Sequence, residues 1–177
     1  MPTDHPALPH PDLLAAIPRL RRYARVLTGE ANRADDLVQD TLARAWEKRG
    51  LWQAGTDLRA WLFTVMHNLF INQRALARRD AATLSLDGGG LSGDAWHPSV
   101  PASQHLHVEL MEVVVQLGRL PAEQREVLVL AAVEEMRYEE IAQVLDIPVG
   151  TVMSRLSRAR AKLRRIVAEP VPLKIVR

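Results

Sequence analysis

The chain has 177 residues, 47% of them hydrophobic and 25% charged, a composition typical of a globular protein with one domain or two small ones. It contains no cysteine, no signal-peptide pattern and no apolar run of about 18 residues, which excludes disulfides and thiolate metal sites, predicts no membrane insertion and fits a cytoplasmic location. Its net charge of +2 is too small to identify a nucleic-acid partner, so the local distribution of charge is the informative quantity.

Residues 81–104 divide the chain into two units. This stretch holds three consecutive glycines at 88–90 and the prolines Pro98 and Pro101, with no sustained apolar period. Such a composition predicts a flexible linker, and a long surface loop within one domain is the alternative. We expect an N-terminal tail at 1–11, a unit at 12–80, the linker at 81–104, a second unit at 105–168 and a C-terminal tail at 169–177.

Neither unit shows a two-residue apolar alternation, so the expected fold class is all-α, with two small helical domains joined by the linker. In the first unit Asp12 caps a short opening turn, Pro18 begins a helix that runs to Thr28, and Gly29 stops it. Asn32 is expected to cap the next helix. Its core face is predicted from three- and four-residue spacing to be Ala34, Leu37, Val38, Thr41, Leu42, Ala45 and Trp46. The opposite, exposed face holds Asp36, Gln39, Asp40, Ala43 and Glu47.

A long helix is predicted over residues 58–79, after a stretch at 50–57 that contains helix breakers. Its buried side is marked by Leu58, Trp61, Leu62, Val65, Leu69 and Leu76. A neighbouring stripe combines cations with aromatic rings: Arg59, Phe63, His67, Phe70, Arg74 and Arg78. Rings that stack on bases beside cations that follow phosphates are typical of surfaces for single-stranded DNA. The alternative is that the two phenylalanines pack in the core and leave a solvated basic edge.

The second unit is predicted to contain a helix-turn-helix. Helices are expected at 106–120 and, after Pro121, at 122–133. A short helix at 138–145, a turn at 146–148 and a longer helix from Val149 follow. In this motif the second helix is offered to the major groove of DNA.

The last helix has three different faces. Its core side is predicted to be Val152, Leu156, Ala159, Leu163 and Ile166. The opposite side has a floor of small residues, Ser154, Ser157 and Ala161, which lets the helix axis approach base edges. Cations flank this floor as Arg155, Arg158, Lys162 and Arg165 on one side and Arg160 and Arg164 on the other.

Charge reverses sharply at the start of this helix. Residues 105–146 hold nine acids and three arginines, whereas residues 149–165 hold six basic residues and no acid. The pattern predicts a DNA-binding face, with Arg158 close enough to the floor to read a guanine, and the alternative is a solvated basic helix without a ligand.

Other chemistry is not supported by the sequence. His105 and His107 would point about 200° apart on a helix, which is unsuitable for chelating a metal. The glycine run at 88–90 lacks the Lys-Ser or Lys-Thr that completes a phosphate loop. No nucleophile has an evident base partner. We therefore expect no enzyme, no metal site and no cofactor.

Taken in order, the motifs resemble the extracytoplasmic-function branch of bacterial sigma factors, whose members contain sigma domains 2 and 4. The resemblance is carried by DDLVQDTLARAW at 35–46, RAWLF at 59–63, NLF at 68–70, LPAEQREV at 120–127, YEEIA at 138–142 and VGTV at 149–152 with Ser154 and Arg155. It covers about residues 12–165.

The resemblance implies an alternative sigma factor without catalytic activity that directs promoter recognition and melting. Its implied partners are the clamp helices and flap region of core RNA polymerase, promoter DNA and an anti-sigma factor. Polymerase contacts are implied for Asp36, Gln39, Asp40, Ala43 and Glu47. Contacts with the −10 element are implied for Trp52, in the loop at 49–57 that helps to hold a flipped base, and for Arg59, His67, Asn68, Arg74 and Arg78. Contacts with the −35 element are implied for Thr151, Ser154, Arg155, Ser157, Arg158, Arg160 and Lys162.

Three positions depart from the family pattern. Met153 stands where a Lys or Arg is common, which puts one DNA backbone contact in doubt. Glu135 replaces a glycine at an expected left-handed position, and Arg137 replaces a capping Ser or Thr.

Two rival functions remain. A sigma mimic that binds an anti-sigma factor without touching DNA would have this fold, but it should lack the basic face. A generic repressor would use the same helix-turn-helix without needing the helix at 35–46. The acids between Glu109 and Glu140 also allow a closed state in which the two units pack, and the sequence leaves the free shape open.

Overall fold

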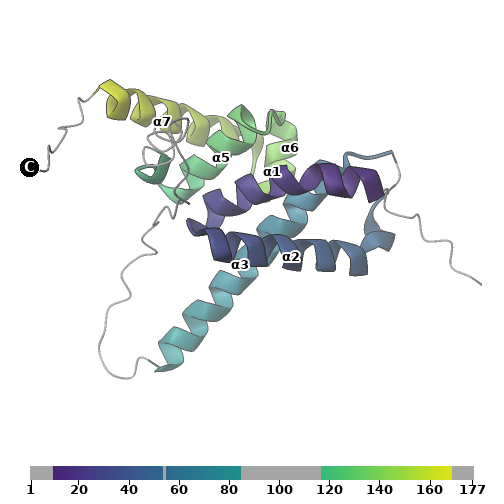
Figure 1. Ribbon diagram of the computed structural model, residues 1–177. Coiled ribbons are helices and arrows are strands. Elements are labelled where there is room, and N and C mark those ends of the chain that lie inside the picture. Colours follow the sequence, from purple (N-terminus) through teal and green to yellow (C-terminus); the bar gives the residue numbers. More distant parts are fainter. Residues whose placement is uncertain (1–9, 54, 85–116, 169–177) are drawn as a thin grey trace, which may run out of the picture.

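The computed structural model describes residues 10–53, 55–84 and 117–168, and the regular elements of these residues are all helices (Figure 1). The first unit consists of α1 (His10–Thr28), α2 (Ala31–Glu47), a short 3-10 helix η1 (Arg49–Leu51) and α3 (Leu58–Leu84). The second contains α5 (Ala122–Ala132), α6 (Tyr138–Leu145) and α7 (Val149–Ala168). The all-α prediction is confirmed. The tails, most of the expected linker and most of the expected helix at 106–120 lie outside the described residues.

Helix α1 is continuous, so the prediction of a separate opening turn before Pro18 was wrong. Pro18 lies inside the helix and on its exposed side. Proline has no N–H to donate there, and this normally weakens a helix. The helix continues because Ala16, Leu20 and Tyr23 on its other side are buried in the core. It ends at Gly29 as predicted, with φ at 74° in the left-handed region that glycine enters freely.

Helix α2 and its N-cap begin two residues earlier than predicted. Glu30 is the N-cap, in an extended conformation, and Asn32 lies within the helix, so the prediction for Asn32 was wrong. The Thr28 hydroxyl donates to the carbonyl of Glu30 at 3.0 Å, which fixes the connection between the two helices.

The core face of α2 is confirmed for five residues and wrong for one. Buried residues are Ala34, Leu37, Val38, Thr41 and Ala45, and Leu42 is half-buried. Trp46 is 48% exposed, and the guanidinium carbon of Arg49 lies 5.3 Å from its ring centroid. Three- and four-residue spacing assigned Trp46 to the core stripe, but its exposure shows that this helix turns the ring toward the surface.

Helix α3 turns a different side to the core than predicted. Asp57 begins it, because its Oδ1 accepts the backbone N–H groups of Arg59 at 2.9 Å and Ala60 at 3.3 Å. The buried residues are Leu58, Leu62, Phe63, Met66 and Phe70. Leu76 is 61% exposed, so its predicted burial was wrong, and Trp61, Val65 and Leu69 are only half-buried. The second half of α3 extends beyond the other helices that the structure describes (Figure 1).

The helix-turn-helix is confirmed. Helix α5 follows Pro121, α6 spans the predicted residues, and Asp146 turns the chain in a left-handed conformation with φ at 50°. The predicted core side of α7 is buried at Val152, Leu156, Ala159 and Ile166, with Leu163 half-buried.

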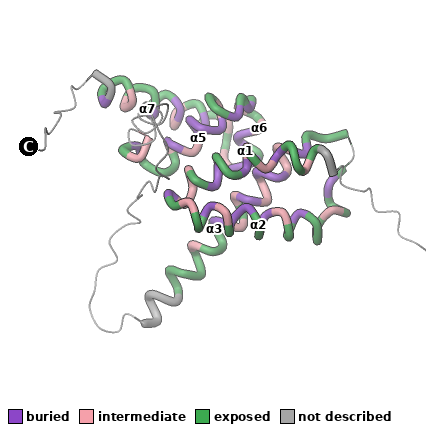
Figure 2. Tube along the Cα trace, in the orientation of Figure 1, coloured by how far each residue is buried: buried purple, intermediate pink, exposed green. Residues whose placement is uncertain are grey.

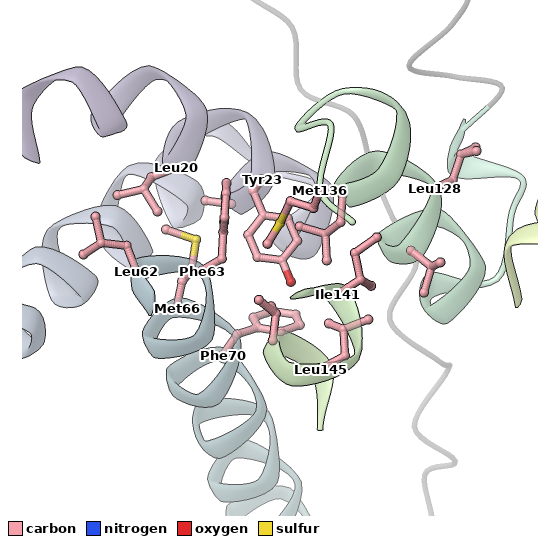
Figure 3. Packing of buried hydrophobic residues seen from close by; sticks show 14 of the residues in the cluster. Leu20, Tyr23, Leu62, Phe63, Met66, Phe70, Leu128, Met136, Ile141 and Leu145 are labelled. Carbon is pink, nitrogen blue, oxygen red and sulfur yellow. The ribbon is translucent and has the colours of Figure 1, made fainter. Parts of the chain in front are cut away.

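The two units pack against each other. Helix α3 contacts α6, and α1 contacts α5, and buried residues lie along these four helices as well as along α2 and α7 (Figure 2). Tyr23, Phe63 and Phe70 from the first unit lie beside Met136, Ile141 and Leu145 from the second in one continuous hydrophobic cluster (Figure 3). Tyr23 and Phe63 meet edge to face, with ring centroids 5.1 Å apart. The chain is therefore in the closed state, which the sequence allowed but did not establish.

Candidate nucleic-acid and polymerase surfaces

The outer face of α7 carries the predicted duplex-binding residues. Ser157, Arg158 and Arg160 are exposed, and Thr151, Ser154 and Lys162 are half-buried. The Ser154 hydroxyl donates to the carbonyl of Thr151 at 3.0 Å, and Arg158 Nη2 donates to Ser154 Oγ at 3.3 Å. The guanidinium of Arg158 thus lies over the floor of small residues, as the spacing predicted. Met153 is 54% exposed on the same helix and offers an apolar side chain where a cation was expected.

Arg155 has a partner that sequence reasoning missed. Its Nη2 lies 2.8 Å from Glu123 Oε2 at the start of α5, and its side chain is only 22% exposed. An opposite charge at this distance holds the guanidinium in one orientation. The pairing depends on how α5 packs on α7, so the sequence of either helix alone does not predict it.

The residues predicted to contact polymerase all lie on the exposed face of α2. Asp36, Gln39, Asp40, Ala43 and Glu47 are all exposed. A groove of about 400 Å³ lies between this helix and α3, lined by residues of both, including Asp40, Ala43, Glu47, Val65, Asn68 and Leu69. Gln73 Nε2 of α3 donates to Asp40 Oδ2 of α2 at 2.9 Å. Asn68 therefore lines the same groove as three of the predicted polymerase residues.

The predicted single-strand stripe on α3 is split by packing. Phe63 and Phe70 are buried, so in the closed chain the alternative that they pack in the core is correct. Arg74 lies over the ring of Phe70 with its guanidinium carbon 5.5 Å from the centroid, and Arg78 is exposed. Arg59 Nη1 donates to the carbonyl of Glu134 at 2.9 Å, so this member of the stripe is held by the second unit.

Trp52 lines a second cavity, of about 500 Å³, between α1 and the loop before α3. Its other lining residues include Asp12, Arg19, Asp57 and Arg59. Trp52 is only 8% exposed, and its indole Nε1 has no hydrogen-bond partner among the residues that the structure describes. A buried N–H donor without a partner is uncommon and is costly unless a ligand or water accepts from it.

A polar cluster joins the two units, and sequence reasoning missed it. The Tyr23 hydroxyl donates to Glu126 Oε1, and His67 Nδ1 lies 2.8 Å from the same oxygen. Burial, then the charge of Glu126 and the hydrogen bond to it, raise the pKa of Tyr23 well above its ordinary value, because each disfavours the phenolate. Glu134 is fully buried, with Oε1 3.1 Å from Arg22 Nη2 and Oε2 3.8 Å from Arg19 Nη1.

The turn before α6 confirms two of the departures noted in the sequence. Glu135 has φ at 54°, so the left-handed position indeed lacks its glycine. Arg137 is the N-cap, and a guanidinium cannot accept a backbone N–H. Glu140 compensates in part, because its Oε2 accepts the N–H of Arg137 at 2.9 Å. That hydrogen bond is the main cause that lowers the pKa of Glu140.

Within residues 10–53, 55–84 and 117–168, no group of three or more acids and histidines is placed to hold a metal ion. In the same part of the chain no helix is long and apolar enough to cross a membrane.

Comparison with known proteins identifies the family. Residues 13–67 match the model of the sigma2 domain of PhyR, and residues 110–163 match sigma-70 region 4. The extracytoplasmic-function (ECF) RNA polymerase sigma factor EcfG of Rhodopseudomonas palustris is 40% identical over 156 residues, which cover 88% of this chain and 83% of the relative. The chain belongs to the ECF sigma factors.

Solved structures agree with this ECF sigma factor's fold. The sigma factor RpoE from Bartonella quintana, in complex with the anti-sigma factor NepR, is 34% identical, with a TM-score of 0.72 over 92% of this chain and 98% of that one. The anti-anti-sigma factor PhyR from the same organism shares the fold, with 16% identity and a TM-score of 0.57 over 90% of this chain and 50% of that one.

Proposed function

We propose that this ECF sigma factor binds core RNA polymerase in the cytoplasm and directs promoter recognition and melting, without catalytic activity of its own. The observation that carries the proposal is the outer face of α7, where six cations and no acid flank a floor of small residues. Residues 12–80 would act as sigma domain 2, residues 105–168 as domain 4 and residues 81–104 as the linker between them.

Domain 4 would read the −35 element through α7. Arg158 is the residue proposed to contact a base edge, since its guanidinium lies over Ser154 and the helix is exposed there. The remaining contacts, mostly to phosphates, are assigned to Thr151, Ser154, Arg155, Ser157, Arg160 and Lys162. The cations supply affinity and salt dependence, and the base contact supplies specificity.

Domain 2 would hold the melted −10 strand. The cavity beside Trp52 is proposed to take a flipped base, because its indole Nε1 is a donor without a partner among the described residues and Arg59 lines the same cavity. Arg59, His67, Asn68, Arg74 and Arg78 would contact the strand. For Arg59 and His67 this requires that the second unit move away, since both contact it in the closed chain.

The exposed face of α2 would bind the clamp helices of core polymerase through Asp36, Gln39, Asp40, Ala43 and Glu47, and domain 4 would bind the flap region. An anti-sigma factor is proposed as the inhibitor. The support is the relative RpoE, which was solved with its anti-sigma factor bound.

Selection from a pool of randomised duplexes tests the reading helix. The wild-type chain should enrich one −35 sequence, and Arg158→Ala should lose base preference at one or two positions, worth about 1–3 kcal/mol of discrimination. Arg164→Ala is the matched control, because it removes an exposed cation from the same helix and should weaken binding to all sequences alike. Equal behaviour of the two variants would show that Arg158 contacts only phosphate.

The second candidate is a sigma mimic, favoured by the match of residues 13–67 to the sigma2 domain of PhyR. A mimic needs no DNA-binding face, whereas Ser157, Arg158 and Arg160 of this chain are exposed on α7. Absence of any duplex enriched by the selection, together with tight binding of an anti-sigma factor, would favour the mimic.

A further inference from the structure

Two acids of the second unit sit among hydrogen-bond donors of the first. Glu126 on α5 accepts a hydrogen bond from the Tyr23 hydroxyl and faces His67. Glu134, in the turn after α5, accepts a hydrogen bond from Arg22 Nε at 3.2 Å through its Oε1. Its backbone carbonyl accepts one from Arg59. The four donors come from α1 and α3, which are far from the two acids in the sequence. They form one polar seat on the first unit, defined here as Arg22, Tyr23, Arg59 and His67.

The contacts of the two acids are largely buried, but the hydrogen bonding of Glu134 is incomplete. Glu134 has no exposed side-chain surface, and the side chains of Glu126 and His67 are 13% and 12% exposed. A buried carboxylate is stable only when charges and hydrogen bonds compensate its lost hydration. Yet Glu134 Oε2 accepts no hydrogen bond from the described residues, and the guanidinium of Arg22 remains half exposed. With Arg19 Nη1 3.8 Å from Oε2 as its remaining charge partner, the hydrogen bonding of the Glu134 carboxylate is only partly satisfied in the closed chain.

The seat overlaps the surface proposed for the −10 strand, because Arg59 and His67 belong to both. Carboxylates and phosphates are both oxygen anions that accept charge-assisted hydrogen bonds from guanidinium, imidazole N–H and hydroxyl donors. The duplex-reading helix behaves differently. Among the described elements α7 contacts α5 and α6 and none of the helices of the first unit, so its outer face stays open in the closed chain (Figure 1).

We propose that Arg22, Tyr23, Arg59 and His67 bind backbone phosphates of single-stranded promoter DNA, and that Glu126 and Glu134 occupy the same seat while the chain is closed. The strand and the second unit then compete for one set of donors. The −35 duplex can bind α7 in either state, whereas the −10 strand binds only after opening. This rests on the proposed function for the identity of the strand, and it adds Arg22 and Tyr23 to the strand-binding residues.

Opening and strand binding can be measured separately. The chain has no cysteine, so Arg33→Cys and Gln143→Cys, both at exposed positions on α2 and α6, allow a dye pair to report the distance between the units by energy transfer. Affinity is measured with a fluorescent random-sequence single strand of DNA. When binding requires the open state, apparent affinity rises in proportion to the open fraction.

Two variants should open the chain but change strand affinity in opposite directions. Glu126→Ala removes a competitor and its contacts with Tyr23 and His67, so energy transfer should fall and affinity should rise at least about tenfold. Arg22→Gln removes a member of the seat, so energy transfer should also fall but affinity should drop. Controls are Glu139→Ala, an exposed acid of α6, and Arg25→Gln, an exposed cation of α1.

Adding the single strand to the wild-type chain should itself lower energy transfer. Glu134→Gln serves as a second opening variant if circular dichroism shows that Glu126→Ala does not fold. The proposal is overturned if Arg22→Gln and Arg25→Gln weaken binding equally, if the opened acid variants bind the strand no better than wild type, or if the strand leaves energy transfer unchanged. Because neither readout uses polymerase, a failure of transcription alone would count against the proposed function and leave the competition standing.

Discussion

Replacing Glu135 by glycine should stabilise the protein, although most substitutions in a folded protein do the reverse. Glu135 is exposed and has φ at 54°. A residue with a β-carbon loses about 1–2 kcal/mol in this left-handed region, and glycine loses about 0.5–1 kcal/mol of additional backbone entropy on folding. The difference predicts a gain of about 0.5–1 kcal/mol for Glu135→Gly, or about 1–4 °C in melting temperature for a chain of this size.

Urea denaturation followed by far-ultraviolet circular dichroism measures the effect directly. Glu135→Ala is the control for the lost charge, because alanine keeps the strained backbone and should give no gain. Asp146→Gly is the control for conformation, since Asp146 also has positive φ, at 50°, but aspartate tolerates this region better. Its gain should be smaller. If Glu135→Gly is no more stable than Glu135→Ala, backbone strain at this turn is not a significant term.

Three further predictions follow from burial and charge. The pKa of Tyr23 is raised above its value of about 10 in the unfolded chain, so the contribution of Tyr23 to the free energy of unfolding should be fully present below pH 10 and fall by about 1.4 kcal/mol per pH unit above it. An absorbance titration of a Tyr138→Phe variant would detect the late ionisation of Tyr23. Titration in the ordinary range would contradict its burial. Leu130→Ala should cost about 2–5 kcal/mol in urea because Leu130 is fully buried, whereas Leu14→Ala, 65% exposed, should change stability by less than about 0.5 kcal/mol; similar costs would refute the assigned core. Asp36→Lys should weaken binding to core polymerase about tenfold in a surface-immobilised assay without changing the melting temperature, and unchanged affinity would remove α2 from the polymerase interface.

Local chemistry explains which elements were predictable. The helix-turn-helix follows from Pro121, from the apolar spacing of α6 and α7, and from the short turn between them, and each signal lies within a few residues of the element it defines. Gly29 likewise marks the end of α1 because the chain must enter a left-handed conformation there. Such features need no knowledge of the rest of the fold.

The errors arose where tertiary packing overrides local pattern. Pro18 reads as a helix start, yet the buried residues on the other side of α1 carry the helix through it. Leu76 has the correct spacing for the core, but it is 61% exposed on the part of α3 that extends beyond the other described helices (Figure 1). Phe63 and Phe70 are buried in the cluster where the helices of both units pack, and spacing alone could not choose between a core and a DNA surface.

The same reason explains what the site prediction missed. Cations on α7 could be found because one helix carries them all. Glu123 beside Arg155, and Glu126 beside Tyr23 and His67, depend on contacts between helices. The reversal of charge near Val149 was the available signal, since it showed that acids collect on the second unit before α7 begins. It could not say which donors those acids would meet.

The sigma assignment is tested most directly by run-off transcription with the purified chain, bacterial core RNA polymerase and a promoter library. Specific transcripts should appear only when the chain is present, from promoters that share one −35 and one −10 sequence. Arg158→Ala should reduce them from the same promoters while core binding is retained. If the chain binds core polymerase or an anti-sigma factor and yields no specific transcript from any promoter, its function as a sigma factor is contradicted.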